Sequence, residues 1–114
     1  VEDVDRACDD LYGAHYSKYF AHWVTRLRDQ LSAPDADAAE FILNTVSRKQ
    51  RGLSRNKLLQ VLIARQPNAD LERLEKQLSF LLDVLERDGY FLRSNSMYAF
   101  RSFILREFWK RRTF

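Results

Sequence analysis

The sequence predicts a mainly helical domain that ends in a short β-hairpin and one further helix. Through most of the chain, apolar residues recur at intervals of three, four and seven, which is the spacing of a helix with one buried face. After Gly89 this period gives way to two short aromatic-rich runs, at residues 90–93 and 97–100. A length of 114 residues with 46% hydrophobic content is enough for one modest core.

Residues 1–34 are expected to form a helical connection that packs on the main domain at residues 35–114. A short apolar stripe at positions 4, 8 and 11 precedes Gly13, and a second helix with one apolar face follows it. Pro34 is expected to stop this second helix, because proline lacks a backbone donor and restricts the residue before it. Cys8 is the only cysteine, so no disulfide forms within the chain, and its helical spacing indicates a small core residue.

Three helices are predicted between residues 36 and 88. Asp35 or Asp37 is expected to cap the first, since a short acidic side chain accepts from the free N–H groups of a helix start. Ser54 is the expected N-cap of the second helix. The third helix covers about residues 70–88 and ends at a glycine, which takes the left-handed conformation common after a helix.

The two aromatic-rich runs flank Ser94-Asn95-Ser96 and are expected to pair as a two-stranded hairpin. Such a hairpin is marginally stable alone, so it must pack against the helices. A last helix is predicted from about Ser102. Three helices followed by a hairpin, over residues 36–101, make the element order of a winged helix-turn-helix, with the helix-turn-helix at residues 54–88.

No catalytic motif is present in the sequence. The three glycines, Gly13, Gly52 and Gly89, stand apart at predicted element ends, so there is no glycine-rich phosphate loop. His15 and His22 lie seven residues apart on one predicted helix, but no further ligands at suitable spacing complete a metal site. The carboxylates fall on predicted solvated helix faces rather than in pairs suited to acid–base chemistry. The chain is therefore expected to be neither an enzyme nor a cofactor-binding domain.

The net charge of +3 conceals an uneven distribution of charge. Residues 48–65 contain six basic residues and no acidic one, whereas the long helix predicted at 70–88 contains more acidic than basic residues. Acidic side chains facing a polyanion weaken the interpretation of that helix as a reader of DNA. The basic segment is either a solvated face or a contact for phosphates. The candidate phosphate or nucleic-acid contacts, including one in the hairpin, are Arg48, Lys49, Arg51, Arg55, Lys57 and Arg93.

Aromatic residues are concentrated towards both ends of the chain. Part of this set must belong to the core, but two terminal helices this aromatic exceed what a three-helix core covers. The excess indicates packing on a neighbouring domain or a partner protein. The candidate protein contacts are Tyr16, Tyr19, Phe20, Trp23, Phe108 and Trp109.

The C-terminal part of the sequence resembles a known family. Residues 98–112 read YAFRSFILREFWKRR, and residues 85–90 before them read LERDGY. Both resemble the winged-helix region that follows the nucleotide-binding module of prokaryotic AAA+ and STAND-type P-loop ATPases. The resemblance covers about residues 36–112 and is strongest over 85–112, with a departure at Phe103, where members often have proline. It implies ATP and Mg²⁺ binding for a parent ATPase, not for these residues.

The sequence therefore favours a non-catalytic, regulatory or protein-interaction domain that contacts its own ATPase module or a partner protein. The alternative is a DNA-binding domain that uses residues 48–57 and the hairpin. The chain opens directly into a helical pattern without an initiator methionine, so we expect it to be part of a larger protein. Without a bilayer-spanning apolar run or the pattern of a signal peptide, it is expected to be cytoplasmic and not bound to membranes, with the oligomeric state left open.

Overall fold

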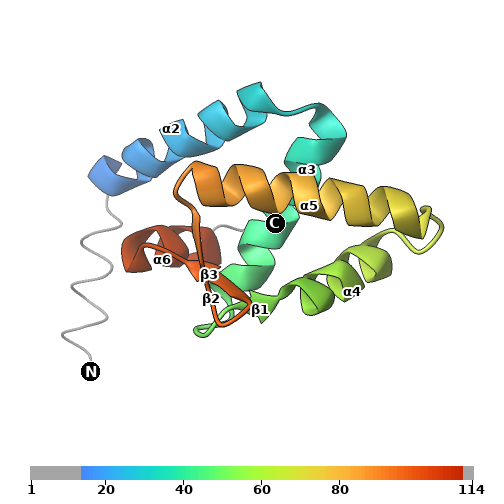
Figure 1. Ribbon diagram of the computed structural model, residues 1–114. Coiled ribbons are helices and arrows are strands. Elements are labelled where there is room, and N and C mark those ends of the chain that lie inside the picture. The colour runs from blue at the N-terminus through green and yellow to red at the C-terminus, as the bar shows by residue number, and fades with distance from the viewer. Residues whose placement is uncertain (1–13, 112–114) are drawn as a thin grey trace.

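The computed structural model describes the backbone of residues 14–111 and the side chains of residues 21–111 (Figure 1). This part of the chain is mainly helical, as predicted, and includes a small antiparallel sheet. Its helices are α2 (Ala14–Gln30), α3 (Ala33–Ser47), α4 (Arg55–Arg65), α5 (Leu71–Arg87) and α6 (Phe103–Arg111). Its strands are β1 (Leu53–Ser54), β2 (Phe91–Ser94) and β3 (Met97–Phe100). The predictions for Cys8 and its neighbours lie outside the described residues.

The core lies where α3, α4 and α5 meet the sheet. Figure 1 shows α5 lying across α3, with α2 above them and α4 below. The inward leucines predicted from the helical spacing, such as Leu78, Leu81 and Leu85 of α5, are fully buried. Each stabilises the fold by about 2 kcal/mol relative to an exposed position. Leu27 of α2 and Trp109 of α6 belong to the same buried cluster, so both flanking helices contribute to one core.

The start of α3 differs from the prediction. A cap at Asp35 or Asp37 is wrong, because the N-cap residue is Ser32, which has an extended backbone with ψ of 159°. Pro34 lies in the first turn of α3 instead of ending α2, which already finishes at Gln30. The first turn of a helix suits proline, since the N–H groups there have no partner within the helix.

The predicted start of α4 and the predicted end of α5 are confirmed. The Ser54 hydroxyl accepts a hydrogen bond from the Lys57 backbone N–H at 3.3 Å, which caps α4. At the end of α5, Gly89 has a φ of +87°. The Tyr90 N–H then donates to the Leu85 carbonyl at 2.9 Å, and the Gly89 N–H donates to the Glu86 carbonyl. This pair of bonds is a Schellman motif, which satisfies carbonyls that the last turn would leave free.

The sheet has one strand more than the predicted two-stranded hairpin. Asn95 and Ser96 both have positive φ, at 53° and 62°, as a two-residue type I′ turn requires, and they join β2 to β3. The additional strand β1 pairs with β3, which gives the order β1-β3-β2. A strand of two residues has no periodic signal in the sequence, and its pairing depends on a partner more than 40 residues later, where Leu53 stands opposite Tyr98.

Gly52 allows β1 to approach β3 closely. Its φ is +81°, and a Cβ placed on it would lie 2.1 Å from the Tyr98 carbonyl oxygen. Both the backbone conformation and the lack of space therefore require glycine at this position. The close approach fixes where the chain between α3 and α4 runs.

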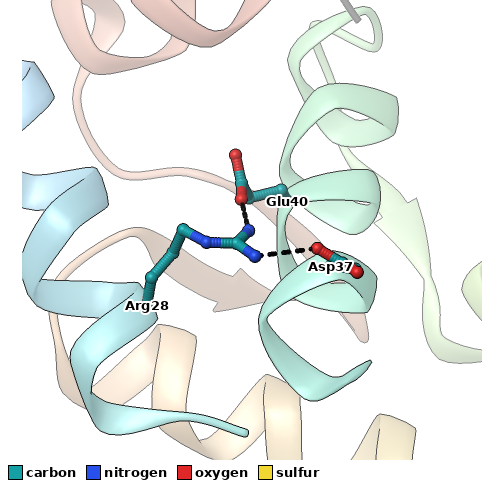
Figure 2. Close-up of polar contacts among 3 residues, drawn as sticks. All are labelled: Arg28, Asp37 and Glu40. Carbon is teal, nitrogen blue, oxygen red and sulfur yellow. Dashed lines mark hydrogen bonds and ion pairs between the residues drawn. The ribbon is translucent and has the colours of Figure 1, made fainter. Parts of the chain in front are cut away.

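The helix α2 is held on the core by polar contacts as well as apolar ones. The Arg28 guanidinium donates to Asp37 at 2.9 Å and also to Glu40 of α3, a carboxylate that is nearly buried (Figure 2). These hydrogen bonds, to Asp37 first and then to Glu40, raise the pKa of Arg28 above its ordinary value. Nearer the middle of α2, the Trp23 carbonyl accepts a hydrogen bond from the Tyr90 hydroxyl at 3.1 Å. The contacts join α2 to both α3 and the start of the hairpin.

Replacing Gly52 with alanine is expected to lower the free energy of unfolding by more than about 2 kcal/mol, because the new Cβ meets the β3 backbone and the residue keeps a left-handed φ. Gly89 is the matched control, since its φ is also positive but no atom lies within 4 Å of the added Cβ. Gly89→Ala should therefore cost only about 1 kcal/mol. Equal losses for the two variants in chemical denaturation would contradict the close approach.

Candidate functional site

Four cations of the basic segment are exposed and have no partner among the residues that the structure describes. Arg48, Lys49 and Arg51 lie between α3 and β1, and Lys57 lies in the first turn of α4. Among the described residues, none of these four side chains makes an ion pair or a hydrogen bond. Their charge is therefore available to an external anion.

Arg55 belongs to the same segment but has a structural role. Its guanidinium donates to the Ser79 hydroxyl at 2.8 Å and to the Glu75 carbonyl at 3.2 Å, both on α5. The side chain thus joins the start of α4 to the middle of α5. Of the predicted phosphate contacts in this segment, Arg55 is the one whose donors are already engaged within the fold.

Arg93, the predicted contact in the hairpin, also has partners. Its Nε lies 3.6 Å from the Glu86 carboxylate of α5. A hydrogen bond with the Tyr98 side chain, followed by the charge of Glu86, raises the pKa of Arg93 above its ordinary value. The structure therefore places Arg93 against α5, where its guanidinium already has a partner.

The outward face of α5 combines paired charges with an exposed aromatic ring. Lys76 lies 3.4 Å from Glu72, one turn away, and Phe80 is 49% exposed. The sequence analysis did not predict Phe80 as an exposed residue. Its exposure could have been predicted, because Phe80 comes two residues after the inward Leu78 and so lies off the apolar stripe of the helix.

A shallow hollow of about 410 Å³ lies beside the free cations. Thr45 of α3 and Lys49, which lies just after that helix, form one side, and Lys57 of α4 forms part of the other. Leu53 of β1 and Val61 of α4 supply apolar parts of the lining. This hollow has no signature in the sequence, since it depends on how β1 brings α3 and α4 together.

Three of the predicted aromatic contacts, Trp23, Phe108 and Trp109, have described side chains, and all three pack within the fold. Trp109 is completely buried and Phe108 is 9% exposed, so the expectation that they contact a partner is not met; α6 packs against α3, which covers them. Trp23 is partly buried, with its ring edge-on to Tyr90 at 5.3 Å. The side chains of the remaining three, Tyr16, Tyr19 and Phe20, lie outside the described residues.

Replacing Arg55 with alanine is expected to lower the free energy of unfolding by about 1 kcal/mol, because α4 loses its side-chain hydrogen bonds to α5. Arg51→Ala, which removes a neighbouring cation that has no partner, should change it by less than about 0.5 kcal/mol. Denaturant unfolding of both variants measures the difference. A wild-type stability for the Arg55 variant would contradict its structural role.

Within residues 14–111, no helix is long and apolar enough to span a membrane. Among the side chains described, at residues 21–111, no cluster of three or more His, Cys, Asp or Glu could hold a metal ion. The chain matches no protein family model, no curated protein and no solved structure. The surfaces described above are therefore the basis for a functional proposal.

Proposed function

We propose that this chain is a non-catalytic winged-helix domain that acts as a protein-interaction or regulatory module of a larger ATPase. The order α3-β1-α4-α5-β2-β3, with β3 between the other two strands, supports the winged-helix assignment. In this assignment α4 and α5 form the helix-turn-helix and the β2–β3 hairpin forms the wing.

The observation that carries the proposal is the charge balance around α5, the helix in the recognition position. Two cations at its surface, Lys76 and Arg93, are each within 4 Å of a carboxylate of α5 itself. A helix that reads DNA needs cations directed at phosphates and free donors at base edges. Arg73 is the exposed cation of α5 without an ion pair among the described residues, but the helix has more acidic than basic residues. A net acidic helix with a half-exposed Phe80 suits a protein partner better, because aromatic side chains are enriched where proteins meet.

The connection to an ATPase rests on the resemblance of residues 85–112 to the region after the nucleotide-binding module in such enzymes. The chain itself has no glycine-rich phosphate loop, so ATP and Mg²⁺ are assigned only to a preceding module. The helix α2 would form the link to that module. Its described side chains on the outer side, such as His22 and Arg26, are exposed and accessible to a neighbour.

DNA binding is a second candidate, favoured by the free cations Arg48, Lys49, Arg51 and Lys57. These residues would contact the phosphate backbone without insertion of α5 into a groove. Phosphate contacts alone position a protein on DNA but carry no sequence information. This candidate therefore predicts binding that depends strongly on salt and little on sequence.

Under the protein-interaction proposal, the chain is expected not to retain duplex DNA at about 50 mM salt. Fluorescence anisotropy with a labelled duplex measures this. Affinity that falls steeply with added salt, and that weakens in Arg51→Ala and Lys57→Ala but not in Lys110→Ala, would overturn the proposal in favour of DNA binding. Lys110 is the matched control because it is an exposed cation on α6.

In a longer form of the parent protein that includes the preceding module, the backbone amides of α2, among them those of Tyr16, Phe20 and Trp23, should exchange several-fold more slowly than in this chain. A contact with the module would suppress local opening of the helix. Hydrogen exchange measured by mass spectrometry compares the two proteins, with α4 as an internal reference. Unchanged protection of α2 would contradict an interface with the ATPase module.

A further inference from the structure

We propose that the hollow between α3, β1 and α4 binds an acidic peptide segment of a partner protein, with one large apolar side chain of that segment against its floor. The inference rests on the proposed protein-interaction function and names a surface and a partner chemistry for it. The proposed peptide site uses the cations that have no partner among the described residues, and it does not include the outward face of α5.

The floor of the hollow is apolar and large enough for a bulky side chain. Leu53 of β1 and Val61 of α4, which are both partly buried, supply apolar parts of its lining. An apolar cavity of about 150 Å³ accommodates a benzene ring. The hollow measures about 410 Å³ and is open to solvent, so an aromatic or leucine side chain fits together with part of its own backbone.

The rim of the hollow is basic on both sides. Lys49 lies just after the end of α3 and Lys57 in the first turn of α4, and Arg48 and Arg51 lie in the same connection as Lys49. Residues 48–65 contain no acidic residue that could neutralise them. Carboxylates on both sides of an apolar anchor would complement this arrangement, and opposite charges also increase the rate at which the partner is captured.

The walls of the hollow are fixed before any partner arrives. The Ser54 cap holds the first turn of α4, and the β1–β3 pairing places Leu53 opposite Tyr98. At the C-terminal end of α4, the Arg65 guanidinium lies over the Phe41 ring of α3, 5.3 Å from the ring centroid. A partner would therefore bind without first ordering these elements, which preserves affinity.

The apolar floor favours a peptide over duplex DNA. A duplex presents phosphates to a basic rim, but its backbone has no large apolar side group that projects outward and could fill a concave floor. An acidic peptide supplies both the carboxylates and the anchor. The two occupants are therefore separated by whether binding depends on an apolar group of the ligand.

The test is a two-dimensional NMR titration of the full ¹⁵N-labelled chain with a short synthetic peptide in which one Trp is flanked by Asp and Glu residues. Peptide binding should shift the amides of Lys49, Lys57 and Val61 first. Changing the peptide Trp to Ser should weaken binding about tenfold, since the floor then loses its apolar contact. Lys49→Glu with Lys57→Glu should also weaken it at least about tenfold, because two favourable charges become repulsive.

Arg101→Glu with Lys110→Glu is the matched control, since it makes the same change of net charge at two other exposed cations and should leave peptide affinity within about twofold. Lys49→Gln with Lys57→Gln provides a second variant if the Glu pair disturbs folding, and should weaken binding about threefold. Equal weakening by the control pair, or shifts confined to other surfaces, would overturn the inference.

Duplex DNA forms the second arm of the same titration. If neither the peptide nor DNA shifts the residues of the hollow, this inference fails while the proposed protein-interaction function stands on its other surfaces. If DNA shifts them and the peptide does not, both fail. Shifts by the peptide that depend on its Trp, without retention of DNA, support both.

Discussion

The turn at Gly89 and Tyr90 is the constraint on which the arrangement of the other elements depends. Gly89 ends α5 in a left-handed conformation, and the Tyr90 N–H closes the last turn by donating to Leu85. The Tyr90 carbonyl accepts from the Arg101 N–H at 2.9 Å, which holds the end of β3, and its hydroxyl donates to Trp23 of α2. A single buried residue thus sets the end of α5, the base of the hairpin and the position of α2.

The sheet converts this anchored hairpin into a support for the segment between α3 and α4. Because β3 is fixed at its base by the bond between Arg101 and Tyr90, it offers a stable edge to β1. Gly52 lets that strand approach without a steric clash. Arg48, Lys49 and Arg51 consequently have a defined backbone position beside the hollow, although they lie in a connection between helices, where chains are usually more variable.

The basic residues of this fold divide into those whose side chains have partners within the fold and those whose side chains are free. Arg28, Arg55 and Arg93 are used internally: they hold α2 on α3, α4 on α5 and the hairpin against α5. Lys49 and Lys57 remain free beside an apolar floor. Residues of the same charge and similar sequence context therefore differ in whether their charge is already used within the fold, and only the free ones are available to the acidic partner that we propose.

The sequence alone determined the features that depend on neighbouring residues: the apolar stripes of the helices, the Ser54 cap, the glycine end of α5 and the change of period that marks the hairpin. Short-range hydrogen bonds and sterics decide these. Tertiary structure decided the rest. Only a partner distant in the chain makes Leu53 and Ser54 a strand, and only the packing of α6 on α3 buries Trp109 in the chain's own core. The division between paired and free cations is likewise tertiary, because an arginine's partners, such as Ser79 for Arg55, are far from it in the sequence.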